Sequence, residues 1–364
     1  MRIESMAIHP ITMRLVTPIP MSNGVVSSTG NVLVELRSDD GVIGWGEGVE
    51  APALTGHRQA DIVSDLEALR DLVIGADPED IEVLWARLAE RAPGASTARG
   101  AIDIAVYDLI GRHRGLPVHA LLGGMQRSRI PALTLVGSGD RGADAEKLSA
   151  WAERGYSWFK IKLAMADREV EWATLAHALE AAGPDGMVCG DANEGWDETT
   201  ADGFLAGLDG MKIRFVEQPV PRDHPDVLLR VAERSPVAIC ADESAGSLEA
   251  VAGFGGTAIG GVSLKLIKHG GITGVMRGAR ACADSGLEVN LAGKVIESTI
   301  SAAANLHCAA AMPGVEYGCS PANQGVVGDV SDHPVTVDEG FFTVPEGPGL
   351  GVEVDRDLVR RLAS

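Results

Sequence analysis

Three apolar segments of the sequence each end in an acidic side chain. GMVCGDAN carries Asp191, IRFVEQPV carries Glu217, and VAICADES carries Asp242 with Glu243 beside it. Asp191 and Glu217 are 26 residues apart, and Glu217 and Asp242 are 25 apart, about one strand-and-helix repeat each time. If each segment is a strand of a parallel sheet, the three carboxylates meet at one edge of that sheet.

Carboxylates that converge in this way repel one another unless a cation lies between them. Oxygen ligands favour Mg²⁺, with Mn²⁺ as a possible substitute, so the spacing predicts a metal site. Any one of these acids alone could instead cap the helix that follows its strand. Three acids in register after three successive strands favour the metal.

Lysines occupy the strand-like segments on both sides of these acids. FKIKLA places Lys160 and Lys162 on one face of a strand, because successive side chains of a strand point to opposite faces. Lys162 precedes Asp191 by 29 residues, and in SLKLIKHGG Lys265 follows the last acid by 23, with Lys268 nearby. A cation and a second lysine beside such a lysine lower its pKa and leave more of it as the free amine, which is a base. The alternative is that the lysines only neutralise the acids.

Acids that hold a metal, with a lysine on each side, suit proton abstraction next to a carboxylate. The metal would bind a carboxylate of a small substrate and stabilise the enediolate that forms when the weakly acidic α-proton leaves. The proton can return on the other face, which is racemisation or epimerisation. A leaving group can instead depart from the β-carbon, which is dehydration, or an internal carboxylate can add to a double bond, which is cycloisomerisation.

The composition is that of a globular protein with a strong acidic excess. The chain has 364 residues, 45% of them hydrophobic, and 31 basic against 51 acidic residues give a formal net charge of −20. This charge argues against nucleic acid and anionic membrane surfaces as partners, because both require basic patches. No apolar run reaches membrane-spanning length, and the N-terminus lacks the pattern of a signal peptide. Five scattered cysteines without a CxxC motif indicate free thiols, so we expect a cytoplasmic protein.

The elements that must position the acids and lysines follow from the pattern of apolar residues. Residues 1–50 alternate as in a β-meander, and residues 57–121 show helical periodicity. From about residue 130, eight short apolar runs alternate with amphipathic helical stretches, which indicates a parallel sheet covered by helices. Eight such repeats fit a TIM-type barrel, whereas the competing doubly wound sheet has no glycine fingerprint after its first strand here. From about residue 336 the runs become β-like again.

Five short motifs occur in a fixed order along the chain. They are KIK at 160–162, DAN at 191–193, VEQP at 216–219, ADES at 241–244 and KLIKHGG at 265–271. In order and spacing they resemble the enolase superfamily, specifically its muconate-lactonizing-enzyme subgroup. GVIGWGEG, AIDIAVYDLIGRHRGLPVHALLGG and GPGLGVEV are similar to the family's framework, so the resemblance covers almost the whole chain. It implies a modified (β/α)₇β barrel over residues 126–335 and an α+β capping domain from residues 1–125, completed by the tail at 336–364.

The resemblance also implies roles for individual side chains. Asp191, Glu217 and Asp242 would be the Mg²⁺ ligands, and Lys162 and Lys265 the acid/base pair. Lys160 would tune the pKa of Lys162 or bind a substrate carboxylate. The residues with supporting roles are Lys160, Asn193, Glu243 and Lys268. The seventh strand, VNLAGKVIES, contains no histidine, so the histidine base of the mandelate-racemase branch has no counterpart.

Substrate identity is expected to depend on the cap loops at residues 17–30 and 50–59 and on the ends of the last two strands. The first of these loops carries no charge that could bind an ionic group. After the seventh strand, Lys294 could bind a second substrate carboxylate, or it could be a surface lysine or a partner of Glu297. At the eighth strand, YGCSPANQ lacks the Asp-x-Asp motif of the dipeptide epimerases that resemble this family, which argues against that activity.

Three functions remain open at this point. The leading one is a Mg²⁺-dependent isomerase, either a racemase or epimerase of an amino-acid derivative or a cycloisomerase. The second is a lyase of the same family that dehydrates a hydroxy acid or a hydroxylated imino acid. The third is a non-catalytic metal-binding barrel, which the intact set of acids and lysines argues against. The resemblance further implies a homo-oligomer.

Overall fold

Eight parallel strands form a barrel at the centre of the protein. The computed structural model describes residues 1–21 and 24–363. The barrel strands pair in chain order, and a bridge between Ala132 and Cys319 joins the last strand to the first. They are β5 (Leu133–Val136), β6 (Trp158–Lys162), β7 (Met187–Asp191), β8 (Ile213–Glu217), β9 (Ala238–Ala241), β10 (Gly261–Leu264), β11 (Glu288–Ala292) and β12 (Gly318–Ser320). All eight apolar runs of the sequence are strands, as predicted.

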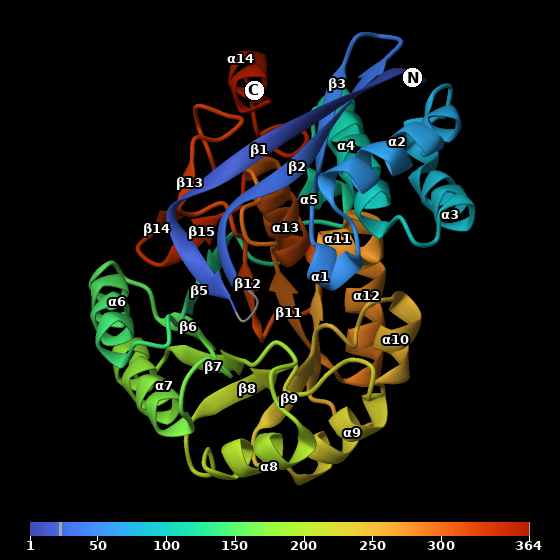
Figure 1. The fold of residues 1–364 in the computed structure, drawn as a ribbon. Coiled ribbons are helices and arrows are strands. Elements are labelled where there is room, and N and C mark those ends of the chain that lie inside the picture. Colours follow the sequence, from blue (N-terminus) through green and yellow to red (C-terminus); the bar gives the residue numbers. More distant parts are fainter. Residues whose placement is uncertain (22–23, 364) are drawn as a thin grey trace.

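Helices surround this sheet on its outer side (Figure 1). A helical segment follows each strand except the last, so the predicted (β/α)₇β barrel is confirmed and the doubly wound alternative is wrong. Several of these helices begin at a side-chain cap, as at Asp140, Asp197 and Ser247, whose oxygens accept hydrogen bonds from backbone N–H groups of the first turn. The helices are α6 (Arg141–Glu153), α7 (Arg168–Ala182), α8 (Glu198–Ala206), α9 (Pro225–Arg234), α10 (Leu248–Gly253), α11 (Leu266–His269), α12 (Ile272–Ser285) and α13 (Thr299–Ala311).

Side chains of the barrel strands alternate between its interior and the surrounding helices. On β6, Phe159 and Ile161 belong to the large hydrophobic core, whereas Lys160 and Lys162 bond to acids of other barrel strands. The predicted alternation of FKIKLA is therefore confirmed. An apolar cluster fills the barrel interior below these lysines: Leu133, Met187, Cys189, Phe215, Cys240 and Tyr317.

An antiparallel sheet and a group of helices form the cap. Three strands pair as the predicted meander, and a short strand from the C-terminal region joins their edge. The strands are β1 (Ile3–Met21), β2 (Gly24–Ser38), β3 (Ile43–Val49) and β13 (Val326–Val327). The helices are α1 (Pro52–Thr55), α2 (Gln59–Val73), α3 (Ile81–Arg91), α4 (Ser96–Arg114) and α5 (Val118–Leu121), with a 3₁₀ turn at Pro78–Asp80. The predicted cap loop at residues 17–30 is the end of the β1–β2 hairpin, and its residues 22–23 lie outside the described residues.

Helix α4 connects the cap to the barrel. Its residues 97–111 are all buried. Strand β3 lies so close to it that a Cβ at Gly46 would come within 2.0 Å of the carbonyl oxygen of Ala101, which explains the glycine. On the barrel side, the Asp103 carboxylate accepts hydrogen bonds from the backbone N–H and the hydroxyl of Thr273 in α12, at 2.9 and 2.7 Å. These contacts fix the cap relative to the barrel.

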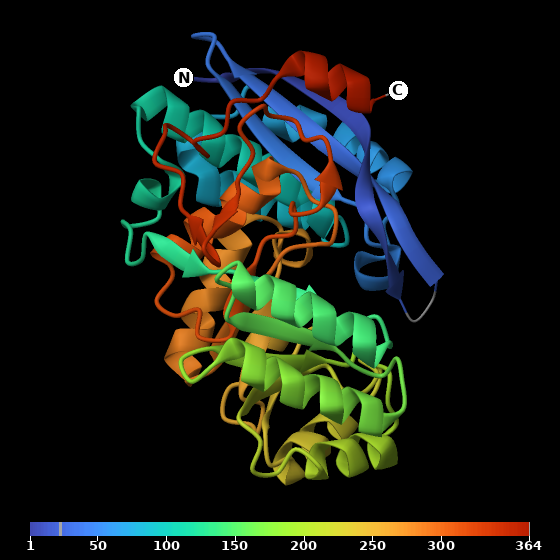
Figure 2. The same cartoon turned by 90° about the vertical axis from the view of Figure 1, so that its left-hand side faces the viewer.

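The C-terminal tail forms part of a separate small sheet and ends in a helix beside the cap. Its predicted β-like runs form β14 (Val337–Asp338) and β15 (Phe341–Thr343), which pair with β4 (Arg129–Pro131). Helix α14 (Arg356–Leu362) was not predicted, and both views place it beside the cap sheet (Figures 1 and 2). Strand β13 joins the cap sheet before residue 336 is reached, and the domain boundaries drawn from the sequence stay a prediction.

Candidate active site at the mouth of the barrel

The carboxyl ends of β6 to β10 bring the predicted acids and lysines together. Lys162 is the register partner of Asp191, and Asp191 is the register partner of Glu217. Asp242 and Lys265 directly follow β9 and β10. Because neighbouring strands of a sheet are about 4.8 Å apart, these side chains surround one small region. The order around the barrel is the predicted one: Lys162, Asp191, Glu217, Asp242 and Lys265.

Glu217 lies inside the barrel within a hydrogen-bonded network. Its carboxylate accepts hydrogen bonds from the Lys160 ammonium group, the Ser263 hydroxyl and, at 3.3 Å, the Asn290 amide. The Asn290 amide also donates to the Ser263 hydroxyl at 2.8 Å. Burial raises the pKa of Glu217, although Lys160 opposes the rise. Burial is the largest single influence on the pKa of Lys160 and acts to lower it. The attraction of Glu217, its hydrogen bond and the attraction of Asp191 act in the opposite direction and leave that pKa raised, so Lys160 is the fixed charge partner of Glu217.

Two lysines share the carboxylate of Asp242. The Lys265 ammonium group donates to one oxygen, and the Lys268 ammonium group donates to the other at 2.7 Å. Burial would raise the pKa of Asp242, but the two ammonium groups outweigh it and lower that pKa. Lys268 also donates to the backbone oxygens of Asp242 and Ser263, at 2.6 and 2.8 Å. All three donors of the Lys268 ammonium group are therefore engaged.

The protein's own side chains raise the pKa of Lys265. Burial is the largest single influence and acts to lower this pKa, but the attractions of Asp242, Glu217 and Glu243 together outweigh burial. The lowered pKa that the sequence predicts for a base lysine requires a cation beside it and stays a prediction, and the protein's own side chains act against it. The reason is that the direct partner of Lys265 is a carboxylate, which favours the protonated lysine.

Asp191, Asn193 and Glu243 form a third cluster at the mouth. The Lys162 ammonium group and the backbone N–H of Asn193 donate to the two oxygens of Asp191, at 3.3 and 3.1 Å. The Asn193 amide donates to Glu243 Oε1 at 3.2 Å. Among the described residues, the buried Asn193 Oδ1 and Glu243 Oε2 have no hydrogen-bond partner. Burial, together with repulsion from Asp242, raises the pKa of Glu243 to about 8.

The donor chemistry of these clusters fits the Mg²⁺ that the sequence predicts. Three carboxylates end adjacent strands, and the two unpartnered oxygens of Asn193 and Glu243 lie beside them. These hard oxygen donors are the type that Mg²⁺ prefers. In the arrangement described, each of the three acids bonds to a lysine, and residues 1–21 and 24–363 contain no group of acidic, His or Cys side chains spaced to hold an ion. Lysines and a cation would compete for the same oxygens.

The loops that follow the strands adopt unusual backbone conformations. Asn193, Glu194, Gln218 and Ile296 have φ values of 41°, 64°, 36° and 68°, in the left-handed region that residues other than glycine rarely occupy. The buried Gln218 side chain accepts two backbone hydrogen bonds from the loop after β9, both at 3.0 Å, which holds this loop in place. Backbone strain of this kind concentrates at functional sites.

The segment after β11 carries Lys294 and Glu297. Glu297 is buried and accepts hydrogen bonds from the backbone N–H groups of Lys294 and Ala322, at 3.2 and 2.8 Å. Burial raises the pKa of Glu297 to about 8. Since the contact between the two residues uses the backbone of Lys294, the suggested ion pair between their side chains is not supported. Lys294 is half-buried, so it is not an ordinary surface lysine either.

Sequence reasoning missed several residues that support the site. Ser263 and Asn290 interrupt apolar strands at inward-facing positions, and that interruption is the signal that could have identified them. Arg222, in the loop after β8, donates to Glu194 at 2.9 and 2.6 Å and to the carbonyl oxygen of Ala53 in α1 at 3.0 Å. Arg222 thereby links the barrel mouth to the cap, a contact that no local pattern predicts.

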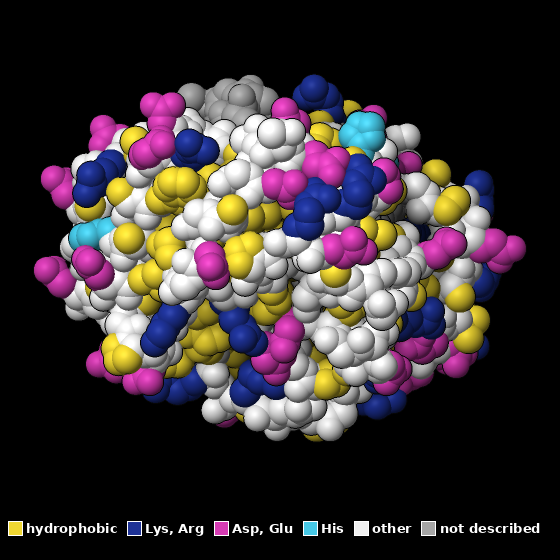
Figure 3. All heavy atoms as spheres, turned by 90° about the horizontal axis from the view of Figure 1, so that it is seen from below, with side chains coloured by type: hydrophobic (Ala, Val, Ile, Leu, Met, Phe, Trp, Pro, Cys, Tyr) yellow, Lys and Arg dark blue, Asp and Glu magenta, His cyan; other side chains and the backbone are white. Residues whose placement is uncertain are grey.

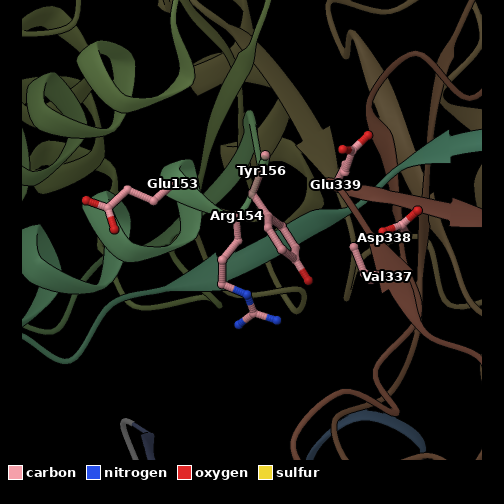
Figure 4. A pocket seen from close by; sticks show the side chains of 7 residues that line it. Glu153, Arg154, Tyr156, Val337, Asp338 and Glu339 are labelled. Carbon is pink, nitrogen blue, oxygen red and sulfur yellow. The ribbon is translucent and has the colours of Figure 1, made fainter.

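A pocket at the other end of the barrel carries no comparable chemistry. It has a volume of about 620 Å³ and is lined by residues 153–156 and 337–339 (Figure 4). Residues 153–156 precede β6, which places the pocket at the N-terminal ends of the strands. Arg154 lies 4.5 Å from the ring centre of Trp151, as a cation over an aromatic face. We place the candidate site at the carboxyl ends of the strands, because the paired acids and lysines converge there.

The outer surface of the molecule is charged with both signs. Seen from below, acidic and basic side chains are interspersed with small hydrophobic areas, and this face shows no continuous basic surface (Figure 3). Among the described residues, no helix has both the length and the apolar character needed to cross a membrane.

Known proteins resemble this chain over its whole length. Residues 2–123 match the family described as mandelate racemase / muconate lactonizing enzyme, N-terminal domain, and residues 143–358 match the enolase C-terminal domain-like family. A chloromuconate cycloisomerase of Pseudomonas sp. (strain P51) is 31% identical over 366 residues, which cover 99% of this chain and 98% of the relative. An N-succinyl-L-Arg/Lys racemase of Bacillus cereus is 27% identical, with 100% of this chain and 98% of the relative covered. The structure of a dipeptide epimerase of Enterococcus faecalis V583, complexed with Mg and L-Leu-L-Tyr, has a TM-score of 0.90 at 27% identity and covers 97% of this chain and 100% of its own.

A (β/α)₇β barrel beneath an α+β cap, with acids and lysines at the strand ends, defines a barrel enzyme of the enolase type. The chain belongs to the enolase superfamily and, within it, to the muconate-lactonizing-enzyme subgroup. Its relatives are named cycloisomerases, racemases and epimerases, so the protein is an isomerase. Members of this superfamily bind Mg, and the related epimerase holds both Mg and a small molecule.

Proposed function

We propose that the protein is a Mg²⁺-dependent isomerase that removes and returns the proton next to a carboxylate of a small substrate. The observation that carries this proposal is the placement of Lys162 and Lys265. Their strands, β6 and β10, lie four positions apart in an eight-stranded barrel, so the two lysines approach the mouth from opposite sides. A substrate carbon between them can lose its proton to one lysine and regain one from the other.

The acids of the mouth position these two lysines. Asp191 accepts a hydrogen bond from Lys162, and Asp242 accepts one from Lys265. A lysine that starts as the free amine takes the α-proton, and the other lysine, still protonated, supplies one to the opposite face. Asp191, Glu217 and Asp242 would hold Mg²⁺. When bound, Mg²⁺ supplies the positive charge that stabilises negative charge on the substrate carboxylate, and it competes with the lysines for these acids.

The network around Glu217 keeps the centre of the site rigid. Lys160, Ser263 and Asn290 fix the carboxylate from three sides, and all four side chains are buried. Groups fixed in this way need no rearrangement during the reaction, which is the main source of electrostatic catalysis. The relatives named above are isomerases, which favours proton return or cyclisation over the dehydratase considered from the sequence.

The proposal includes a homo-oligomer in a reducing, cytoplasmic compartment. The cysteines of the described residues are all buried and form no disulfide. Free, buried thiols are typical of proteins that fold under reducing conditions.

Proton exchange with solvent tests the proposed reaction. The protein would be incubated in D₂O with Mg²⁺ and pools of N-acylated amino acids, proline derivatives, dipeptides, muconate and sugar acids, and the α-proton signals would be followed by NMR. We expect one pool to lose an α-proton signal without elimination products. Vinyl or keto-acid products would instead identify a dehydratase.

Variants of the two lysines test their separate roles. We expect Lys162→Ala to remove exchange from one stereoisomer and Lys265→Ala from the other, each by about 10²- to 10⁴-fold, because each lysine serves one face. The matched control is Lys212→Ala, which removes an exposed lysine at the opposite end of the barrel. Equal exchange of both stereoisomers in either active-site variant would contradict the two-lysine mechanism.

A further inference from the structure

Lys294 places a third ammonium group at the barrel mouth. It follows β11, the strand next to the one that ends at Lys265. Its side chain is half-buried, and the charges that act on it include those of Lys265 and Lys162. Lys162 and Lys265 each bond to an acid of the mouth. No hydrogen bond or ion pair joins the Lys294 ammonium group to another of the described residues.

The backbone that carries Lys294 is held from both the barrel and the cap. Ile296 has a φ of 68°, a strained value for a β-branched residue. Its carbonyl oxygen accepts a hydrogen bond from the Asn31 amide of the cap at 2.9 Å. The next residues are fixed by Glu297 below and by the cap residue Glu47, which accepts the backbone N–H of Ser298 at 3.0 Å. These contacts hold the backbone from which the Lys294 side chain extends.

The surroundings of the Lys294 ammonium group favour the binding of an anion. An ammonium group that is partly removed from water without a partner is unfavourable, and two neighbouring lysines add repulsion. Glu297 and the cap residue Glu50 are the nearby acids, but both carboxylates already accept backbone N–H groups. Glu297 accepts those of Lys294 and Ala322, and Glu50 accepts those of Gly30 and Gln59, at 2.9 and 3.1 Å. Burial, followed by the repulsion of Lys265, lowers the pKa of Lys294 to about 8, in agreement with this view.

We propose that Lys294 binds a second anionic group of the substrate, so that the preferred substrate carries a distal carboxylate in addition to the one beside the reacting carbon. This inference rests on the proposed function, because it takes the mouth between Lys162 and Lys265 as the substrate site. Lys294 is then a residue that determines specificity. The distal carboxylate would lie toward β11 and the cap, with the reacting carbon between the two other lysines.

Binding of simple dicarboxylates tests this inference without turnover. The probes are the saturated dicarboxylates from succinate to suberate, each compared with its monomethyl ester, which lacks one charge. Dissociation constants would be measured by calorimetry with the Mg²⁺-loaded protein. We expect at least one dicarboxylate to bind about tenfold or more tightly than its ester, because a charge-assisted hydrogen bond is strong in a partly buried site. The preference should weaken with added salt.

Three variants show whether Lys294 is the source of the preference. Lys294→Met keeps most of the length of the side chain and removes the charge, and it should reduce the preference to less than about twofold. Lys294→Arg keeps the charge and should keep most of the preference. Lys212→Met, an exposed lysine at the other end of the barrel, is the matched control and should leave the preference unchanged.

Two results would overturn the inference. One is a wild-type protein that binds no dicarboxylate more tightly than its ester. The other is an unchanged preference in Lys294→Met. A preference that depends on Lys294, in a protein that exchanges no α-proton with any substrate pool, would support the anion site and contradict the proposed isomerase, so the two hypotheses fail separately.

Discussion

The two ends of the barrel interior are built from the same repeat but differ in almost every physical respect. Toward the N-terminal ends of the strands, the interior is apolar, and the rings of Phe215 and Tyr317 stack with their centres 4.2 Å apart. Toward the carboxyl ends, the interior holds Lys160, Glu217 and the other charged residues of the mouth, nearly all hydrogen-bonded to one another.

This difference separates stability from chemistry within one sheet. The apolar end gains stability from burial and ring stacking and requires no specific partner beyond shape. The charged end costs free energy, because each buried charge must be matched by another, and the strained loops add to this cost. Variants at the two ends should therefore have opposite effects, with activity lost at the mouth and stability lost at the apolar end.

The largest effect on activity is expected from Glu217→Gln. The substitution keeps the shape of the side chain but removes the charge that pairs with Lys160 and that would bind Mg²⁺. We expect proton exchange to fall by at least about 10³-fold, the loss typical for a preorganised charge at an active site. Titration with Mg²⁺, monitored by thermal stabilisation, should show weaker metal binding than in the wild type.

The matched control for Glu217→Gln is Asp338→Asn in the pocket at the other barrel end. It removes one carboxylate in the same way. Proton exchange should stay within about twofold of the wild type, because Asp338 lies away from the carboxyl ends of the strands. If Glu217→Gln kept wild-type exchange and Mg²⁺ binding, the metal-ligand role of Glu217 would be wrong. If Asp338→Asn lost as much activity, the contrast between the two ends would not hold.

A smaller effect is expected from Ser263→Ala. The hydroxyl of Ser263 donates to Glu217 and accepts the Asn290 amide at 2.8 Å, so its loss frees two buried polar groups. We expect kcat to fall about tenfold with little change in KM, the size of one lost hydrogen bond to a charged group. Ser263→Thr, which retains the hydroxyl, is the control. A change in KM alone would show that Ser263 acts on substrate binding rather than on the position of Glu217.

The sequence predicted the parts of this contrast that depend on regular geometry. Strand alternation placed Lys160 and Lys162 on one face, and the repeat length placed Asp191, Glu217 and Asp242 at the ends of successive strands. Both predictions follow from local periodicity, which is the same in every barrel of this kind.

What the sequence did not predict depends on contacts between distant segments. Asn290 meets Glu217 only because the barrel closes, and Arg222 meets α1 only because the cap lies over the mouth. The raised pKa of Lys265 follows from its direct contact with Asp242, which spacing alone cannot distinguish from mere proximity. The strained φ of Ile296 likewise has no signal in its own side chain.

The smallest effect on activity is expected from Phe215→Leu, which should lower stability instead. Phe215 is fully buried and stacks on Tyr317 below the charged layer, two residues before Glu217 on the same strand. Its truncation leaves a partly filled cavity and should lower the free energy of unfolding by about 1–2 kcal/mol, seen as a lower Tm by calorimetry. Exchange should stay within about twofold, because Glu217 is held by side-chain partners on other strands rather than by the ring beneath it. A loss of exchange comparable to that of Ser263→Ala, at unchanged Tm, would show that the apolar layer itself positions the acids, and that the two ends of the barrel are coupled.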